Sequence, residues 1–186
     1  MRPDDTPRRP AFSRHREALV AGMLAAACAL APGMSRAGLL TDDAPWLEGE
    51  VPAPPAFDLN RLIDVTPSGS PSSLRIGVDP ATISVGKDDR VVRYVVVAAS
   101  PAGALNVMYE GILCAKGEYR LYARYRESDG WRMLDDSGWQ PLARLSQRYP
   151  QDIARGGLCR ESSPNGTPAN IARGLQRGQS VPLVSP

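Results

Sequence analysis

Three segments of strand length follow one another between residues 90 and 126, and they limit the fold more than any other feature of the chain. Residues 90–99 are rich in β-branched side chains, and residues 104–114 and 118–126 follow after short turn sequences. Strand-like runs separated by such short turns are typical of antiparallel hairpins. The sequence therefore predicts an antiparallel meander, and residues 74–78 and 81–85 are two further strand candidates.

The turn lengths predict how these strands pair. A four-residue turn at 100–103 and a three-residue turn at 115–117 fix both registers. One face is then apolar: Val92, Tyr94, Val96 and Ala98 lie beside Gly111, Tyr109, Val107 and Leu105, and on the same face Leu113, Gly111, Tyr109 and Val107 meet Tyr119, Leu121, Ala123 and Tyr125. The other face is mixed and sets Arg93 directly across from Glu110, so we expect a cross-strand ion pair there.

Helices of the C-terminal third are expected to cover the mixed face. Pro150 must interrupt or restart the first of them. Thr167 and Pro168 form a helix start, and Gly178 is a stop for a helix over residues 169–177. The fold class that we predict is α+β: an antiparallel β-meander with C-terminal helices packed on one face and one disulfide. The apolar positions at near-helical spacing before the second helix are Leu142, Leu145, Tyr149 and Ile153.

The first 37 residues have the organisation of a secretory signal peptide. A basic cluster at 14–16 precedes an uncharged run at 18–31, and Ser35 and Ala37 are the small residues that signal peptidase requires. The run is shorter than the roughly 20 apolar residues of a transmembrane helix. We expect cleavage after Ala37, export to the periplasm and no transmembrane helix in the mature chain. Cys28 follows three alanines and allows an alternative, an outer-membrane lipoprotein anchored at Cys28.

Removal of residues 1–37 would change the charge balance. These residues contain six of the 22 basic and three of the 20 acidic side chains, so residues 38–186 carry 16 basic and 17 acidic ones. A net charge of −1 gives no basic excess for nucleic-acid binding. We divide the remainder into a Pro-rich lead-in at 38–73, a single α+β domain at 74–178 and a flexible tail at 179–186.

Cysteine and histidine content limits the chemistry. Only Cys114 and Cys159 remain after residue 37, and two cysteines in a small exported domain normally form a disulfide. The only histidine is His15, so residues 38–186 lack the base of Ser-His-Asp and Cys-His sites and the commonest transition-metal ligand. We therefore predict a structural disulfide, no catalytic residues, no metal site and no cofactor.

Two groups of side chains keep other functions open. Glu110 and Glu118 fall on one face in the predicted register, where two carboxylates can serve a hydrolase of cell-wall or glycan material. The expected cationic partner of Glu110 argues against this alternative. Arg120, Tyr122 and Arg124 share the mixed face of one predicted strand and form a candidate binding surface, although a solvated strand face explains them as well.

Several motifs in sequence order resemble those of a known family. They are NVMYEGI at 106–112, GEYRLYA at 117–123, GW at 130–131 and Trp139. Their order and spacing are similar to the cryptic neisserial protein-like family of exported proteobacterial proteins, over about residues 46–178. The resemblance implies a signal peptide or lipid anchor and a single domain, and it brings no catalytic residues. Leu113 and Arg160 depart from the family pattern, in which Arg and Pro are usual.

These observations favour a non-catalytic function. We expect an exported envelope or periplasmic protein that binds another envelope protein or envelope component, or that stabilises a structure. No nucleic-acid partner is expected. The carboxylate-dependent hydrolase is the alternative, and it requires a cleft lined by two acids that have no cationic partners.

Overall fold

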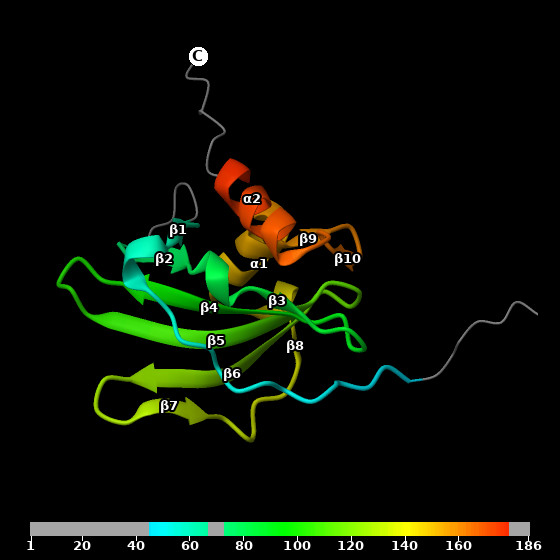
Figure 1. Cartoon of the computed structure of the whole chain (residues 1–186), viewed down its shortest axis with the longest axis horizontal. Helices are drawn as coiled ribbons and strands as arrows, with labels where there is room; N and C mark the ends of the chain where they lie inside the picture. The colour runs from blue at the N-terminus through cyan, green and yellow to red at the C-terminus, as the bar shows by residue number, and fades with distance from the viewer. Residues whose placement is uncertain (1–44, 67–72, 179–186) are drawn as a thin grey trace, which may run out of the picture. The chain divides into compact units, whose positions relative to one another are not determined.

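The computed structural model of the chain describes residues 45–66 and 73–178. All of them belong to one unit, Ala44–Pro186, in which helices cover one face of a sheet (Figure 1). The predicted signal peptide, with its alternative processing site at Cys28, lies outside the described residues, and so does the predicted tail at 179–186.

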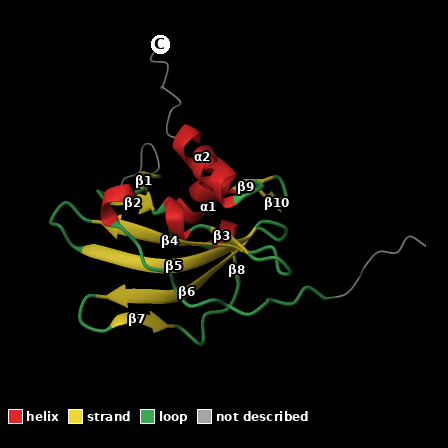
Figure 2. Ribbon diagram, viewed as in Figure 1, coloured by secondary structure: helices red, strands yellow, loops and turns green. Residues whose placement is uncertain are grey.

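The sheet of the described region is antiparallel throughout and has eight strands in the order β1-β2-β4-β5-β6-β7, with β3 beside β4 and β8 beside β6 (Figure 2). Its centre consists of the three strands that the sequence predicts: β4 (Val92–Ala99), β5 (Leu105–Leu113) and β6 (Glu118–Arg126). The outer and short strands are β1 (Ile63–Asp64), β2 (Arg75–Val78), β3 (Ser84–Val85), β7 (Gly130–Met133) and β8 (Gln140–Pro141).

The pairing of β4 with β5 differs from the prediction by one residue. Ala99 pairs with Leu105, so the connecting loop has five residues, 100–104, rather than four. The Gly103 amide, at a φ of +83°, donates to the Ser100 carbonyl at 2.9 Å and closes this loop. Because side chains alternate along a strand, a shift of one residue moves every β5 side chain to the opposite face relative to β4. The predicted common face of these two strands is therefore wrong.

The pairing of β5 with β6 matches the prediction only on the side of a β-bulge that is far from the turn. Tyr109 pairs with Ala123 as predicted, but Glu110 pairs with Leu121 and Leu113 pairs with Glu118, so the turn has four residues, 114–117, rather than three. Tyr122 is the extra residue of the bulge. It therefore packs with Ala123 in the same apolar cluster instead of pointing to the opposite face. The bulge thus directs the Tyr122 side chain to the face away from the helices.

Residues 81–85 do not form the predicted strand. The first part is a 3-10 helix, η2 (Pro80–Thr82), and only β3 pairs with the sheet. Asp79 caps η2 by accepting the Ala81 amide at 3.0 Å, and Arg61 at the end of η1 (Leu59–Arg61) contacts the same carboxylate at 2.9 Å. This side-chain capping draws the backbone into a turn and attaches the N-terminal segment to the edge of the sheet.

The C-terminal third covers one face of the sheet with short elements. The predicted helix through Leu142 and Leu145 is wrong, because Leu142 lies in a 3-10 turn and Leu145 follows it. Pro150 stands in the first turn of α1, where a backbone N–H has no partner within the helix, so the N–H that proline lacks is not missed. The elements are η3 (Leu142–Arg144), α1 (Tyr149–Ile153), the π-helical turn η4 (Ala154–Leu158), the hairpin of β9 (Cys159–Arg160) and β10 (Ser163–Pro164), and α2 (Pro168–Gly178).

Helix α2 confirms the predicted cap and packs closely on η4. The Asn170 amide donates to Oγ1 of Thr167 at 3.3 Å. A Cβ atom on Gly157 would come within 2.4 Å of the Gly174 carbonyl carbon, and Gly157 has a φ of +144°. Glycine is required there, because any side chain would push α2 away from the layer beneath it.

Candidate functional site

The described chain buries one glutamate on each face of the sheet, and polar side chains gather around both. Glu110 on β5 has no exposed surface, and it lies on the face that the C-terminal elements cover. The side chain of Glu48 in the extended N-terminal segment is 15% exposed and lies against the other face. Burial of a carboxylate is unfavourable unless hydrogen bonds or cations compensate it, so these two sites are the strongest candidates for a functional role.

Four donors surround the Glu48 carboxylate, three of them on β4 and β6 and one just before β8. Oε1 accepts from Arg93 at 3.3 Å and from the Tyr122 hydroxyl at 2.5 Å. Oε2 accepts from Arg120 at 2.5 Å and from the Trp139 indole at 3.1 Å. We call Glu48, these four residues and Asp89 the Glu48 cluster. Its donors occupy both carboxylate oxygens, so the cluster holds the N-terminal segment on the sheet.

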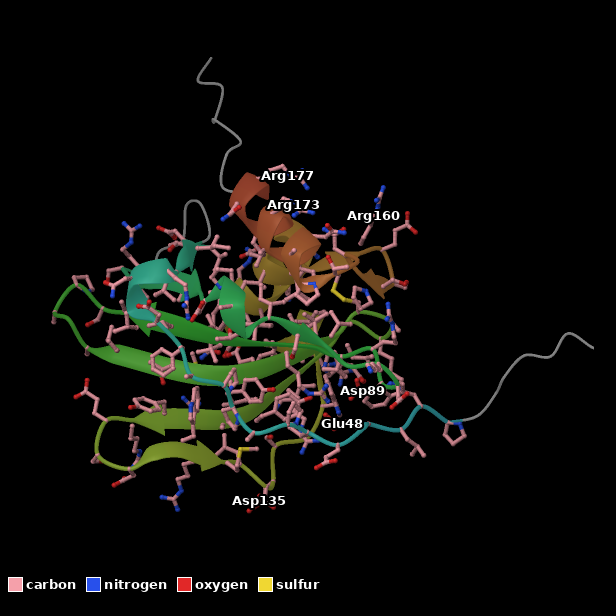
Figure 3. All side chains as sticks on the ribbon, in the orientation of Figure 1. Glu48, Asp89, Asp135, Arg160, Arg173 and Arg177 are labelled. Carbon is pink, nitrogen blue, oxygen red and sulfur yellow. A yellow bond between two sulfur atoms is a disulfide. The ribbon has the colours of Figure 1, made fainter. Side chains whose placement is uncertain are left out.

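Asp89 completes the Glu48 cluster from the turn before β4, and Figure 3 shows the two acids beside each other. Its carboxylate accepts from Arg93 Nη2 at 2.6 Å and from the amides of Val91 at 3.0 Å and Gly49 at 3.1 Å. Burial opposes ionisation of Asp89, but the hydrogen bonds from Arg93 and the two amides lower its pKa below the ordinary value. Asp89 therefore remains a charged partner of Arg93 at neutral pH.

Aromatic rings close the Glu48 cluster. Trp46 donates to the Asp89 carbonyl at 3.0 Å and meets Trp139 edge-on at 5.5 Å between centroids. The Lys116 ammonium lies 4.9 Å from the centre of the Trp46 ring. Both Arg93 and Arg120 lie over the Tyr122 ring at 5.3 Å. These contacts reduce the exposure of the ion pairs to solvent and so strengthen their attraction.

Three tyrosines and no cation bind the Glu110 carboxylate. The hydroxyls of Tyr94 on β4 and Tyr119 on β6 donate to it at 3.2 and 2.8 Å, and Tyr149 of α1 donates to it as well. We call these four residues the Glu110 cluster. Burial raises the pKa of Glu110 to about 7, although the hydrogen bonds from the tyrosines and the charge of the exposed Arg124 act in the opposite direction. The cluster is therefore a buried proton-binding site that titrates near neutral pH and connects α1 to the sheet.

A single glycine makes room for the Glu48 cluster. A Cβ atom on Gly111 would lie 2.6 Å from Cε2 of Tyr122, so the ring that the bulge redirects lies directly on the Gly111 backbone. Arg93 and Arg120 are the neighbours of Gly111 on β4 and β6. The absence of a side chain at this position lets both guanidinium groups and the ring converge on Glu48.

The predicted ion pair between Arg93 and Glu110 is wrong. Because of the one-residue shift, Arg93 lies opposite Gly111 and Glu110 lies opposite Tyr94. Arg93 points to the face of the N-terminal segment and binds Asp89 and Glu48 instead. The prediction failed because the loop at 100–104 has five residues rather than the four assumed, and loop length sets the register.

The two acids considered for a hydrolase lie on opposite faces. Glu118 pairs with Leu113, which is three residues from Glu110 along β5 and therefore points the other way. They cannot flank one bond.

The candidate binding surface of Arg120, Tyr122 and Arg124 does not exist as one patch. Tyr122 is 2% exposed and Arg120 is bound to Glu48. Arg124 is exposed, packs on the opposite face and donates to Oδ1 of Asn106 at 3.3 Å. The bulge explains the separation, because residues on its two sides no longer alternate regularly.

The predicted disulfide is confirmed. Cys114 at the end of β5 is bonded to Cys159 of β9, with Cα atoms 5.7 Å apart. The bond fastens the C-terminal elements to the face that carries Glu110, as expected. Within the described residues, no three of the residue types that bind metals come together in a group that could hold an ion. No helix in that part of the chain is long and apolar enough to span a membrane.

The profile of the CNP1-like family matches residues 41–176, which is most of the chain. The chain belongs to the CNP1-like family. This agrees with the resemblance inferred from the motifs, and the matched region contains every member of both clusters. No curated protein and no solved structure matches the chain.

Sequence reasoning missed Glu48 and the role of Tyr149. Glu48 lies in the Pro-rich lead-in, 72 residues from Arg120 and 91 from Trp139, and no local pattern connects them. For Tyr149, a signal was present. Several tyrosines at apolar positions need buried acceptors for their hydroxyls, and Glu110 is such an acceptor.

Proposed function

We propose that this CNP1-like chain is an exported, non-catalytic binding domain of the cell envelope. One observation carries the proposal: the carboxylates that would be the first candidates for chemistry are bound by donors of the chain itself. Glu48 accepts four side-chain hydrogen bonds and Glu110 accepts three. The Glu48 cluster attaches the N-terminal segment to the sheet and the Glu110 cluster attaches α1, so the polar residues of both clusters have a structural role.

The hydrolase alternative has less support. A raised pKa suits a general acid, and Glu110 has this property. However, a glycosidase needs a second carboxylate within about 10 Å on the same side of the substrate. Glu110 is fully buried, and Glu118 lies on the other face.

Export can be tested on cells that express the full chain. We expect the protein in the envelope or periplasmic fraction with Cys114 bonded to Cys159. Mass spectrometry of its N-terminus distinguishes cleavage before Gly38 from a lipidated Cys28. An intact, reduced protein in the cytoplasm would contradict the proposal.

The binding role needs a test that would also reveal hydrolase activity of the protein. In-cell crosslinking of the exported protein, followed by envelope extraction, should return the same component repeatedly. The purified protein should release no soluble fragments from cell-wall or glycan material. Release that disappears in Glu110→Gln but persists in Glu118→Gln would overturn the non-catalytic proposal and favour the hydrolase.

A further inference from the structure

The C-terminal layer carries charge of one predominant sign. Residues 142–178 contain six arginines, no lysine and only two acidic residues, Asp152 and Glu161. In the other described residues, 13 acidic side chains outnumber 10 basic ones. The C-terminal layer therefore has a net charge of +4 and the remaining described part a net charge of −3. Such a separation orients a protein in the field of a charged partner.

Within the described residues, the arginines of this layer form no ion pairs. Every ion pair in that part of the chain joins residues between 48 and 120. All six C-terminal arginines are exposed. Arg173 bonds to the neutral amide of Asn170 within α2. The positive charge is thus available to a partner from outside.

Three of these arginines lie on the outer side of the layer. Figure 3 shows Arg173 and Arg177 on α2 and Arg160 on β9, all on the side away from Glu48, with Asp135 at the opposite end of the view. Arg173 and Arg177 are one helical turn apart. We call Arg160, Arg173 and Arg177 the arginine face.

The arginine face is held rigidly although it is exposed. Arg160 follows Cys159, which the disulfide ties to β5. Gly174 on α2 lies against Gly157, and a Cβ atom on Gly178 would come within 2.7 Å of the Gly156 carbonyl oxygen, so α2 packs closely on η4 at both positions. These contacts fix the two elements that carry the arginines, so binding would require little ordering of the backbone.

We propose that the arginine face binds the anionic phosphate headgroups of a membrane surface. Guanidinium groups match phosphate oxygens with paired hydrogen bonds, which lysine cannot do. The arginines are spread over two separate elements instead of converging on one point, which fits an extended array of phosphates better than a single small anion. The inference rests on the proposed envelope location, and it names the partner class for that binding domain.

Vesicle co-sedimentation of the protein purified from cells expressing the full chain tests the inference. Phosphatidylcholine vesicles with about 30% phosphatidylglycerol should bind it, and pure phosphatidylcholine vesicles should not. The variant R160Q/R173Q/R177Q should bind at least about tenfold more weakly, because each arginine contributes separately to the attraction. The matched control R90Q/R126Q/R132Q removes the same charge from exposed positions outside the C-terminal layer and should bind as the wild type does.

The other outcomes overturn the inference. Equal losses in both triple variants would mean that net charge alone matters. Displacement by inorganic phosphate at constant ionic strength would indicate a discrete anion site rather than a membrane surface. Failure of the wild type to bind anionic vesicles, while in-cell crosslinking still returns an envelope partner, would refute the membrane surface and leave the proposed function standing.

Discussion

The two faces of the sheet each bury a glutamate, but they compensate it differently. On the face of the N-terminal segment, Arg93 and Arg120 bind Glu48 and the arrangement is an ion-pair network. On the face of the C-terminal elements, three tyrosine hydroxyls bind Glu110 without a cation. A hydroxyl donates a hydrogen bond but supplies no net charge, so burial raises the pKa of Glu110 to about 7.

This difference shows how one sheet can hold two segments, the N-terminal segment and the C-terminal layer, by contacts that respond differently to pH. The pKa of Arg93 is raised and that of Asp89 is lowered, so this pair remains charged across the neutral range. Burial opposes the ionisation of each group, but the hydrogen bonds between Arg93 and Asp89 outweigh this effect. Glu110 changes protonation within that range. The attachment of the C-terminal layer should therefore respond to pH, and that layer has the disulfide as a second fastening.

Removal of the disulfide should give the largest loss, and only on one face. The double variant Cys114→Ala/Cys159→Ala should lower the free energy of unfolding by about 4 kcal/mol, since the bond closes a loop with a sequence separation of 45. Hydrogen exchange should accelerate in α2 before it does so in β4 or around Glu48. Equal acceleration on both faces would break the comparison.

Removal of Arg93 should destabilise the other face. Arg93→Met leaves Glu48 and Asp89 without their shared cation, so we expect a loss of about 3 kcal/mol in urea unfolding. This loss is at the low end of the range for removing one partner of a buried ion pair, because Arg120 still binds Glu48. The exposed Arg126→Met is the control and should change stability by less than about 0.5 kcal/mol. Similar values for both variants would contradict a buried ion-pair network.

The pH dependence of stability should belong to the face of Glu110. The folded protein holds the Glu110 proton more tightly than the unfolded chain does, because the folded pKa is raised from 4.5 to about 7. The free energy of unfolding should therefore fall by roughly 2–3 kcal/mol between pH 5 and pH 8. Glu110→Gln should remove this fall, and Glu118→Gln should retain it. A fall that persists in Glu110→Gln would assign it to another group.

Local features of the sequence predicted much of this fold. The three central strands follow from β-branched runs between turns, α2 from the Thr167 cap, and the disulfide from the two remaining cysteines. The Tyr109 and Ala123 pairing was also predicted correctly, but only because the extra residue of the bulge offsets the extra residue of the turn at 114–117.

The candidate site could not be predicted in the same way. A five-residue loop at 100–104 and the bulge at Tyr122 each shift the alternation by one residue, and together they decide which face every polar side chain occupies. Three of the four Glu48 contacts join residues more than 70 positions apart. Such contacts depend on tertiary packing, which no local pattern encodes.

Carboxyl carbon NMR of Glu110 in the oxidised protein tests the central claim most directly. The account predicts a titration midpoint at about 7, and a further rise in Tyr149→Phe, which loses one hydrogen bond to the carboxylate. Tyr125→Phe, on the other face, should leave the midpoint unchanged. A wild-type midpoint near 4, as for an exposed glutamate, would contradict a buried carboxylate that lacks a cation.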